Sequence, residues 1–93
     1  MSDKARVHLI ISGRVQGVFY RAFTRETAVR HGLRGWVGNL YDGTVEALFE
    51  GDKNAVEAAV AECYKGPPSS HVEHIEITWE AWTGGLETFS VRY

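Results

Sequence analysis

Residues 13–21 read Gly-Arg-Val-Gln-Gly-Val-Phe-Tyr-Arg, and the predicted fold can be built outward from this stretch. Before it, residues 6–12 alternate between two faces, one of them wholly apolar (Val7, Leu9 and Ile11), which predicts a strand. After it, the period becomes helical from residue 19 or 20 to 31, and Gly32 follows as a C-cap. The residues expected on the inner face of this helix are Tyr20, Phe23, Thr27, Ala28 and His31. The stretch therefore joins a strand to a helix.

The remaining sequence predicts a strand pair, a second helix and two further strands. Asp42-Gly43 marks a hairpin turn between two strand patterns. Asp52 is a good N-cap for the second helix, and Gly66-Pro67-Pro68 ends it. The predicted strands are residues 33–40, 44–50, 72–80 and 88–93, and the apolar stripe of the second helix is Val56, Ala59, Val60 and Cys63.

The order of these elements predicts an α+β fold. It is β-α-β-β-α-β with an extra short C-terminal strand, the order of the ferredoxin-like sandwich. Two helices cannot cover both faces of so small a sheet, so we expect both on one face of an antiparallel sheet. The other sheet face is then expected to be solvated, and Glu46 and Glu50 are among its residues.

Length, charge and cysteine content narrow the classes of protein to which the chain can belong. Its 93 residues fit a single domain, residues 1–93. The formal charge of −2 gives no electrostatic reason to bind nucleic acid. A single cysteine, Cys63, excludes an internal disulfide framework and a cysteine-based zinc site. With no run of about 18 apolar residues and no apolar signal core, we expect a cytoplasmic protein with no membrane partner.

The loop within residues 13–21 has the features of an oxyanion site, and a phosphoryl group fits it. A helix start has unpaired N–H groups and a partial positive charge, and N–H groups in a curved loop can converge on one anion. Gly17 lets the backbone approach closely, and Arg21 can direct a planar fork at two phosphate oxygens. The same spacing also suits a tight turn with a solvated arginine, so spacing alone leaves both interpretations open. The loop lacks the features of a Walker loop or a dinucleotide-binding fingerprint.

Asn39 is the second candidate for a functional residue. It interrupts an apolar strand, where asparagine is disfavoured, and its amide has both the donor and the acceptor that orienting a water molecule requires. It also suits a structural role as a strand-end residue that supports the Asp42-Gly43 turn. His71 and His74 make a poor metal pair, because side chains three apart on a strand tend to opposite faces. We therefore predict no metal site.

These blocks together resemble the acylphosphatase family, and the resemblance covers essentially the whole chain. The residues that carry it are 13–21, Gly32-Leu33-Arg34-Gly35-Trp36-Val37-Gly38-Asn39, Asp42-Gly43-Thr44-Val45-Glu46, Gly66-Pro67-Pro68 and Phe89-Ser90-Val91-Arg92-Tyr93. Tyr20 stands where the family usually has phenylalanine, which is a mild departure.

The resemblance implies an acylphosphatase, which hydrolyses the carboxyl-phosphate anhydride of a small acyl phosphate to carboxylate and inorganic phosphate. It further implies that water attacks phosphorus without a metal, a cofactor or a covalent intermediate. By similarity, Arg21 binds the phosphoryl oxygens and Asn39 positions the water. The loop residues whose N–H groups would hold the phosphoryl group are Val15, Gln16, Gly17, Val18, Phe19 and Tyr20. We expect a monomer, although an exposed edge strand would permit association.

Two other functions are compatible with the predicted fold. A binding module for RNA or a small ligand would need exposed aromatic residues and a basic surface on its open sheet face. The open face here offers mostly Arg6, His8, Ile10, Thr44, Glu46 and Glu50, which disfavours that function. A domain that acts on carbamoyl phosphate within a larger maturation factor is the second alternative, and the length of the chain disfavours it. Phosphate release from benzoyl phosphate in the presence of EDTA separates an enzyme from a binding module.

Overall fold

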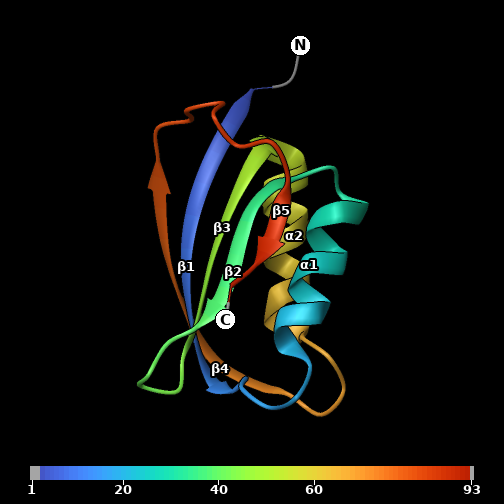
Figure 1. The fold of residues 1–93 in the computed structure, drawn as a ribbon, viewed down its shortest axis with the longest axis vertical. Coiled ribbons are helices and arrows are strands. Elements are labelled where there is room, and N and C mark those ends of the chain that lie inside the picture. The colour runs from blue at the N-terminus through green and yellow to red at the C-terminus, as the bar shows by residue number, and fades with distance from the viewer. Residues whose placement is uncertain (1–2, 93) are drawn as a thin grey trace.

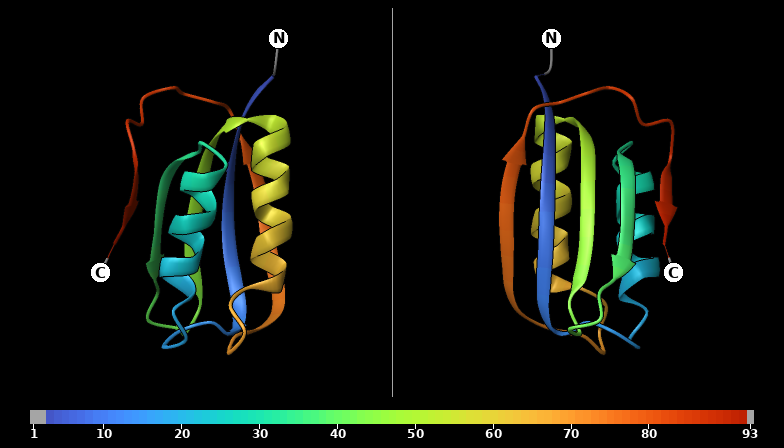
Figure 2. Two further views of the ribbon diagram at one scale, coloured as in Figure 1. Left: turned by 90° about the vertical axis from the view of Figure 1, so that its right-hand side faces the viewer. Right: turned by 60° about the vertical axis from the view of Figure 1, so that its left-hand side comes forward.

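The fold is built on one sheet with two helices packed against it. The computed structural model describes residues 3–92 of the chain. The elements in chain order are β1 (Lys4–Arg14), α1 (Tyr20–Arg30), β2 (Arg34–Asn39), β3 (Val45–Asp52), α2 (Lys53–Lys65), β4 (His71–Glu80) and β5 (Phe89–Val91). The strands lie in the order β4-β1-β3-β2-β5, and both helices cover the same face (Figures 1 and 2). The predicted ferredoxin-like arrangement is confirmed.

The last strand makes the sheet mixed. β1 pairs antiparallel with β3 and with β4, and β2 pairs antiparallel with β3. β5 instead runs parallel to β2, with Gly35 opposite Phe89 and Val37 opposite Val91. The predicted antiparallel pairing thus holds for the first four strands and not for the fifth. The reason is that the connection after β4 crosses the end of the sheet and brings the chain back beside β2 in the same direction (Figure 2).

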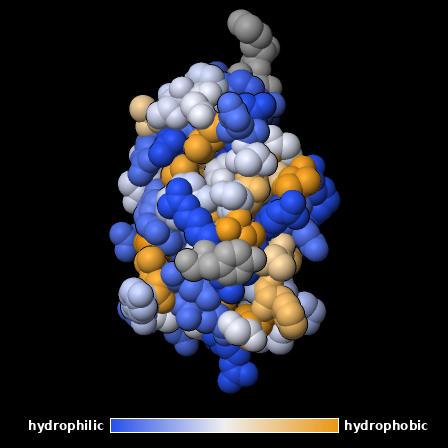
Figure 3. Space-filling view, in the orientation of Figure 1, coloured by the Kyte–Doolittle hydropathy of each residue, from blue (hydrophilic) through white to orange (hydrophobic). Residues whose placement is uncertain are grey.

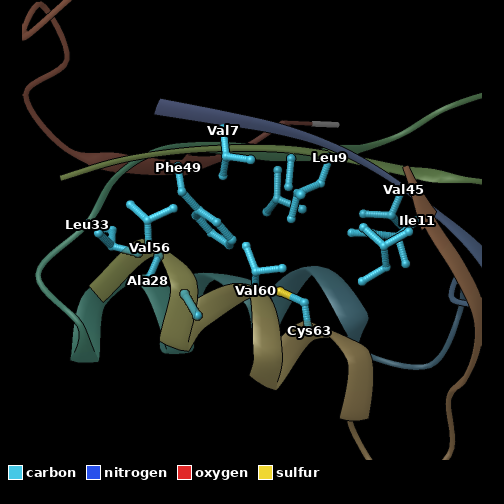
Figure 4. Close-up of a cluster of buried hydrophobic side chains, with 14 of the residues drawn as sticks. Val7, Leu9, Ile11, Ala28, Leu33, Val45, Phe49, Val56, Val60 and Cys63 are labelled. Atoms are coloured by element: carbon cyan, nitrogen blue, oxygen red, sulfur yellow. The ribbon is translucent and has the colours of Figure 1, made fainter. Parts of the chain in front are cut away.

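The core lies between the sheet and the helices. The inward residues of β1 (Val7, Leu9 and Ile11) are fully buried, as their alternation predicted. They point toward the helices together with Val45 and Phe49 of β3 (Figure 4). The buried residues of α2 are Val56, Ala59, Val60 and Cys63, which confirms the predicted stripe.

Cys63 is a free thiol at the C-terminal end of the α2 stripe. Burial raises the pKa of its thiol to about 12. The thiol therefore stays protonated at neutral pH and behaves as a small apolar side chain. No helix between residues 3 and 92 is long and apolar enough to span a membrane.

The inner face of α1 is slightly rotated from the predicted one. Its buried residues are Tyr20, Thr24, Thr27 and Ala28, whereas Phe23 is half-buried beside Tyr20 with 6.1 Å between ring centroids. Thr24 can take the inner position because its hydroxyl donates to the Tyr20 carbonyl oxygen at 2.9 Å. The helix supplies its own partner for a buried polar group.

The end of β1 and the capping of α2 also differ from the predictions. β1 continues past Gly13 to Arg14, through an irregularity in its pairing with β4. Gly13 has a φ of 126°, and a side chain there would collide with the His71 carbonyl oxygen, so this position requires glycine. Asp52 lies at the N-cap of α2, but its carboxylate makes no capping bond and pairs with Lys4 instead (Nζ to Oδ1, 2.6 Å).

The open face of the sheet is less solvated than predicted, because Glu50 is only 3% exposed. Its carboxylate accepts hydrogen bonds from Arg6 at 2.7 Å and from the N–H and hydroxyl of Thr83 at 3.1 Å and 2.8 Å. Burial alone would raise the pKa of Glu50, but the bonds from Arg6 and Thr83 outweigh burial and lower it. The prediction of a solvated Glu50 was wrong, since the connection between β4 and β5 covers this end of the face.

The opposite end of the sheet carries two loops that matter for function. The loop between β1 and α1 and the hairpin between β2 and β3 both lie at the lower end of the molecule in Figure 1. Residues 13–21 and Asn39, which are separate in sequence, are thereby brought to one end of the sheet.

Candidate active site

The loop between β1 and α1 presents a row of unpaired donors. Gly17 and Phe19 both have positive φ angles, 72° and 64°, so the chain curves tightly between them. No group within residues 3–92 accepts a hydrogen bond from the backbone N–H groups of residues 15–20. α1 begins at Tyr20, so the partial positive charge of its N-terminus adds to these donors. A left-handed phenylalanine is strained by roughly 1 kcal/mol, which is typical of a loop shaped for a ligand.

Arg21 lies in the first turn of α1, half-buried, with its guanidinium held by the chain that follows β5. Its Nη1 donates to the Arg92 carbonyl oxygen at 3.1 Å. Arg92 is fixed in turn, because its N–H donates to the Val37 carbonyl oxygen at 2.7 Å and its guanidinium carbon lies 3.9 Å from the ring centroid of Trp36. The last part of the chain thus orients the candidate phosphate-binding arginine.

Asn39 is the last residue of β2 and is exposed. Alternation along the strand places it on the same face as the buried Val37, toward the helices and the loop of residues 15–19. Its side chain makes no hydrogen bond to another residue between Asp3 and Arg92. The amide is therefore available to a water molecule, and the alternative role in supporting the Asp42-Gly43 turn falls to Asp42 itself, whose Oδ1 accepts from Thr44.

Gln16 connects the loop to the hairpin that follows Asn39. Its Nε2 donates to the carbonyl oxygens of Leu40 at 2.7 Å and Thr44 at 2.8 Å. Sequence reasoning considered only the backbone of Gln16, since the carbonyl partners lie in a distant hairpin and leave no pattern in the sequence. These two bonds fix the loop relative to the end of β2, and so relative to Asn39.

Tyr20 connects the same loop to the second helix. Its hydroxyl donates to the Cys63 carbonyl oxygen at 2.6 Å, and its side chain is only 1% exposed. Cys63 lies in the last turn of α2, and four residues later Pro67 has no N–H to offer that carbonyl. Burial, with the nearby Cys63, raises the pKa of the Tyr20 phenol far above its usual value, so it remains a neutral donor. The tyrosine anchors the start of α1 to the end of α2.

The loop, Arg21 and Asn39 surround one cavity of about 470 Å³. Its lining residues are Val15, Gly17, Phe19, Tyr20, Arg21, Ala22, Arg25, Glu26, Asn39 and Val91. Of the residues predicted from sequence, only Gln16 and Val18 are not in this lining. Gln16 points to the hairpin, and Val18 packs against the hydrophobic core.

Groups of three or more metal-binding side chains (His, Cys, Asp or Glu) do not occur among residues 3–92. The charge that faces the cavity comes instead from Arg21, Arg25, Glu26 and the helix N-terminus. This lining can hold an anion by hydrogen bonds and positive charge.

The structure is thus a ferredoxin-like α+β sandwich with unpaired backbone N–H groups and an arginine at the start of its first helix. Comparison with known proteins gives the family. The acylphosphatase family model matches residues 7–91. An acylphosphatase from Roseiflexus sp. (strain RS-1) is 50% identical over 91 residues, 98% of either chain. The crystal structure of an acylphosphatase from Bacillus subtilis has a TM-score of 0.92 and 39% identity, and covers 96% of this chain and 99% of its own.

The chain belongs to the acylphosphatase family. It is an enzyme of the acylphosphatase type, a hydrolase that acts on acid anhydrides, with an acyl phosphate as substrate and phosphate as product. The same fold occurs within a longer protein, since HypF from T. kodakarensis matches with a TM-score of 0.84 and 32% identity over 96% of this chain but 12% of that one. The family membership favours the enzyme over the non-catalytic binding module.

Proposed function

We propose that the cavity at the β1–α1 loop hydrolyses acyl phosphates by direct attack of water on phosphorus. The N–H groups of residues 15–20 and the Arg21 guanidinium hold the three phosphoryl oxygens, and Asn39 orients the attacking water on the other side of phosphorus. The oxygen–phosphorus bond to the carboxylate breaks as the bond to water forms. The observation that supports the proposal is that the loop with its unpaired N–H groups borders the same cavity as Arg21 and Asn39.

The chemistry requires little from the protein beyond position and charge. Phosphoryl transfer is accelerated by positioning and by stabilising the charge on the phosphoryl oxygens. A carboxylate is a good leaving group, so no general acid is needed. Asparagine cannot act as a base, so the proton of the attacking water passes to a phosphoryl oxygen of the substrate. The step uses no metal, cofactor or covalent phosphoenzyme.

Arg21→Ala should abolish both phosphate binding and turnover, because it removes the charged half of the phosphoryl clamp. We expect kcat/KM for benzoyl phosphate to fall by about 10³-fold or more, with competitive inhibition by inorganic phosphate lost. Phosphate release is measured with EDTA present, and Arg30→Ala, at the other end of α1, is the matched control. Near-normal hydrolysis by folded Arg21→Ala protein would overturn the role of Arg21.

Asn39→Ala should separate rate from affinity. It removes the group that orients water and leaves the clamp intact, so kcat should fall by about 10²-fold while inhibition by inorganic phosphate stays within a few-fold of wild type. Asn54→Ala, at an exposed position of α2, is the control. Loss of phosphate inhibition in folded Asn39→Ala protein would assign Asn39 to the clamp instead.

We also propose that the protein acts as a cytoplasmic monomer without nucleic acid. The formal charge of −2 supports the lack of a nucleic-acid partner. Hydrophobic side chains on the face seen in Figure 3 occur in small groups between hydrophilic ones, which supports a monomer. Sedimentation velocity at catalytic concentrations tests this, and a dimer with unchanged sedimentation on dilution would contradict it.

A further inference from the structure

The cavity extends beyond the part that a phosphoryl group would fill. Past the loop it is lined by Ala22, Arg25 and Glu26 of α1 and by Val91 of β5. Ala22 and Val91 give this side of the cavity apolar surface, and Arg25 and Glu26 give it charged groups. If the phosphoryl group lies on the loop, the acyl group of the substrate lies here.

In this part of the cavity, Arg25 is the residue that can make the enzyme prefer one acyl group over another. It is four residues after Arg21, so both side chains project from one face of α1, about 6 Å apart along the helix axis. Arg25 is exposed, and within residues 3–92 its guanidinium makes no hydrogen bond or ion pair. Arg30 of the same helix, by contrast, donates twice to Glu62 at 2.9 Å.

Two arginines four apart on a helix repel each other by a few tenths of a kcal/mol. A ligand with two anionic groups would remove that repulsion by binding one group at each arginine. Glu26 opposes this effect, but part of its charge is compensated by Arg30, one turn further along α1. The positive charge of Arg25 therefore remains directed into the cavity.

We propose that Arg25 forms a second anion subsite, so that the enzyme prefers acyl phosphates that carry another carboxylate or phosphate at the far end of the acyl group. This inference rests on the proposed function. Arg21 and the loop bind the phosphoryl group being transferred, Arg25 binds the second anion, and Ala22 and Val91 contact the carbon chain between them. A chain of a few carbons spans one helical turn.

The test compares two substrates with the same five-carbon chain, glutaryl phosphate, which ends in a carboxylate, and valeryl phosphate, which ends in a methyl group. Wild-type enzyme should show a kcat/KM about five- to tenfold higher for glutaryl phosphate, mostly through KM, as one solvent-exposed ion pair allows. Arg25→Gln should lower kcat/KM for glutaryl phosphate more than for valeryl phosphate and so remove this preference. Arg25→Lys should retain part of the preference, and Glu26→Gln should increase it.

Lys53→Gln is the control, since it removes one positive charge from an exposed position of α2 outside the cavity. It should leave the glutaryl-to-valeryl ratio unchanged, whereas an effect of net charge alone would lower the ratio in both glutamine variants. Equal kcat/KM values for the two substrates in wild type, or an equal loss on both substrates in Arg25→Gln, would overturn the subsite while the hydrolase assignment stands. Absence of phosphate release from both substrates by wild type would overturn the hydrolase assignment and the subsite with it.

Discussion

Two buried threonines of α1 differ in whether the side-chain hydroxyl has a hydrogen-bond partner, and this difference affects the stability of the fold. Thr24 and Thr27 are both fully buried. The Thr24 hydroxyl donates to the Tyr20 carbonyl oxygen, whereas the Thr27 oxygen has no hydrogen-bond partner within the described part of the chain. A buried hydroxyl without a partner has lost its hydrogen bonds to water and gained none, so it destabilises the fold.

Thr27→Val should therefore stabilise the protein. Valine has the same shape and a similar helix propensity, so the change removes the unpaired oxygen and little else. We expect the free energy of unfolding in urea to rise by about 1 kcal/mol. Thr24→Val is the matched control in the same helix and should lower the free energy of unfolding, because its hydroxyl is bonded. A Thr27→Val protein less stable than wild type would contradict this account.

At the scale of elements, an ion cluster clamps the end of α1 to α2. Glu62 of α2 accepts from Arg30 at 2.9 Å and also bonds His31, the C-cap of α1. The bonds from Arg30 and His31 lower the pKa of the Glu62 carboxyl from 4.5 to about 2. A carboxyl with a lowered folded-state pKa stabilises the protein above its unfolded-state pKa, and this stabilisation is lost as the pH falls through the folded-state value.

Glu62→Gln should consequently destabilise the protein in a pH-dependent way. At pH 6 the loss should be roughly 1 kcal/mol, because the cluster is partly exposed and solvent screens it. The difference from wild type should shrink between about pH 4.5 and pH 2, as the wild-type carboxyl becomes protonated. Urea unfolding at several pH values measures this, with Glu57→Gln, at an exposed position of α2, as the control. An unchanged difference at pH 2 would exclude the ion pairs as the cause.

At the scale of the whole molecule, Glu50 links the first strand to the connection that precedes the last strand. It lies on β3 and receives hydrogen bonds from Arg6 of β1 and from Thr83 of the connection to β5. Arg6 also donates to Glu80 at 2.9 Å, so the start of that connection is tied to the sheet. The position of β5 decides where the Arg92 carbonyl oxygen meets Arg21.

Glu50→Ala should lower the free energy of unfolding by about 2–3 kcal/mol, because it leaves Arg6 and Thr83 without a buried acceptor. Thermal and urea unfolding measure the loss. Glu46→Ala, on the same strand and face, removes a carboxylate that is 29% exposed and should cost less than 1 kcal/mol. Equal losses in the two variants would contradict a special role for Glu50.

Local patterns in the sequence predict most of the fold. The alternation of Val7, Leu9 and Ile11 and the stripe of α2 follow from strand and helix periods, and both were confirmed. What could not be predicted depends on segments far apart in sequence. The direction of β5 is set by how the preceding connection crosses the sheet, and the burial of Glu50 depends on Thr83, 33 residues later.

For the candidate site too, local features could be predicted from the sequence and contacts between distant segments could not. Residues 13–21 and Asn39 could be predicted because a glycine-containing loop before a helix and a polar residue in an apolar strand are local signals. The bonds from Gln16 to the hairpin, from Tyr20 to α2 and from Arg21 to the chain after β5 could not, since each partner is a backbone carbonyl with no signature in the sequence.

The burial of Cys63 has a practical consequence for measuring motion. A thiol reagent reaches this sulfur only after α2 has separated from the sheet, and the sequence contains no other cysteine to compete for the reagent. The rate of labelling at high reagent concentration therefore equals the rate at which the helix opens. Since Tyr20 connects the end of α2 to the loop between β1 and α1, phosphate bound at this loop should slow the opening, and the labelling rate of the thiol would then report ligand binding.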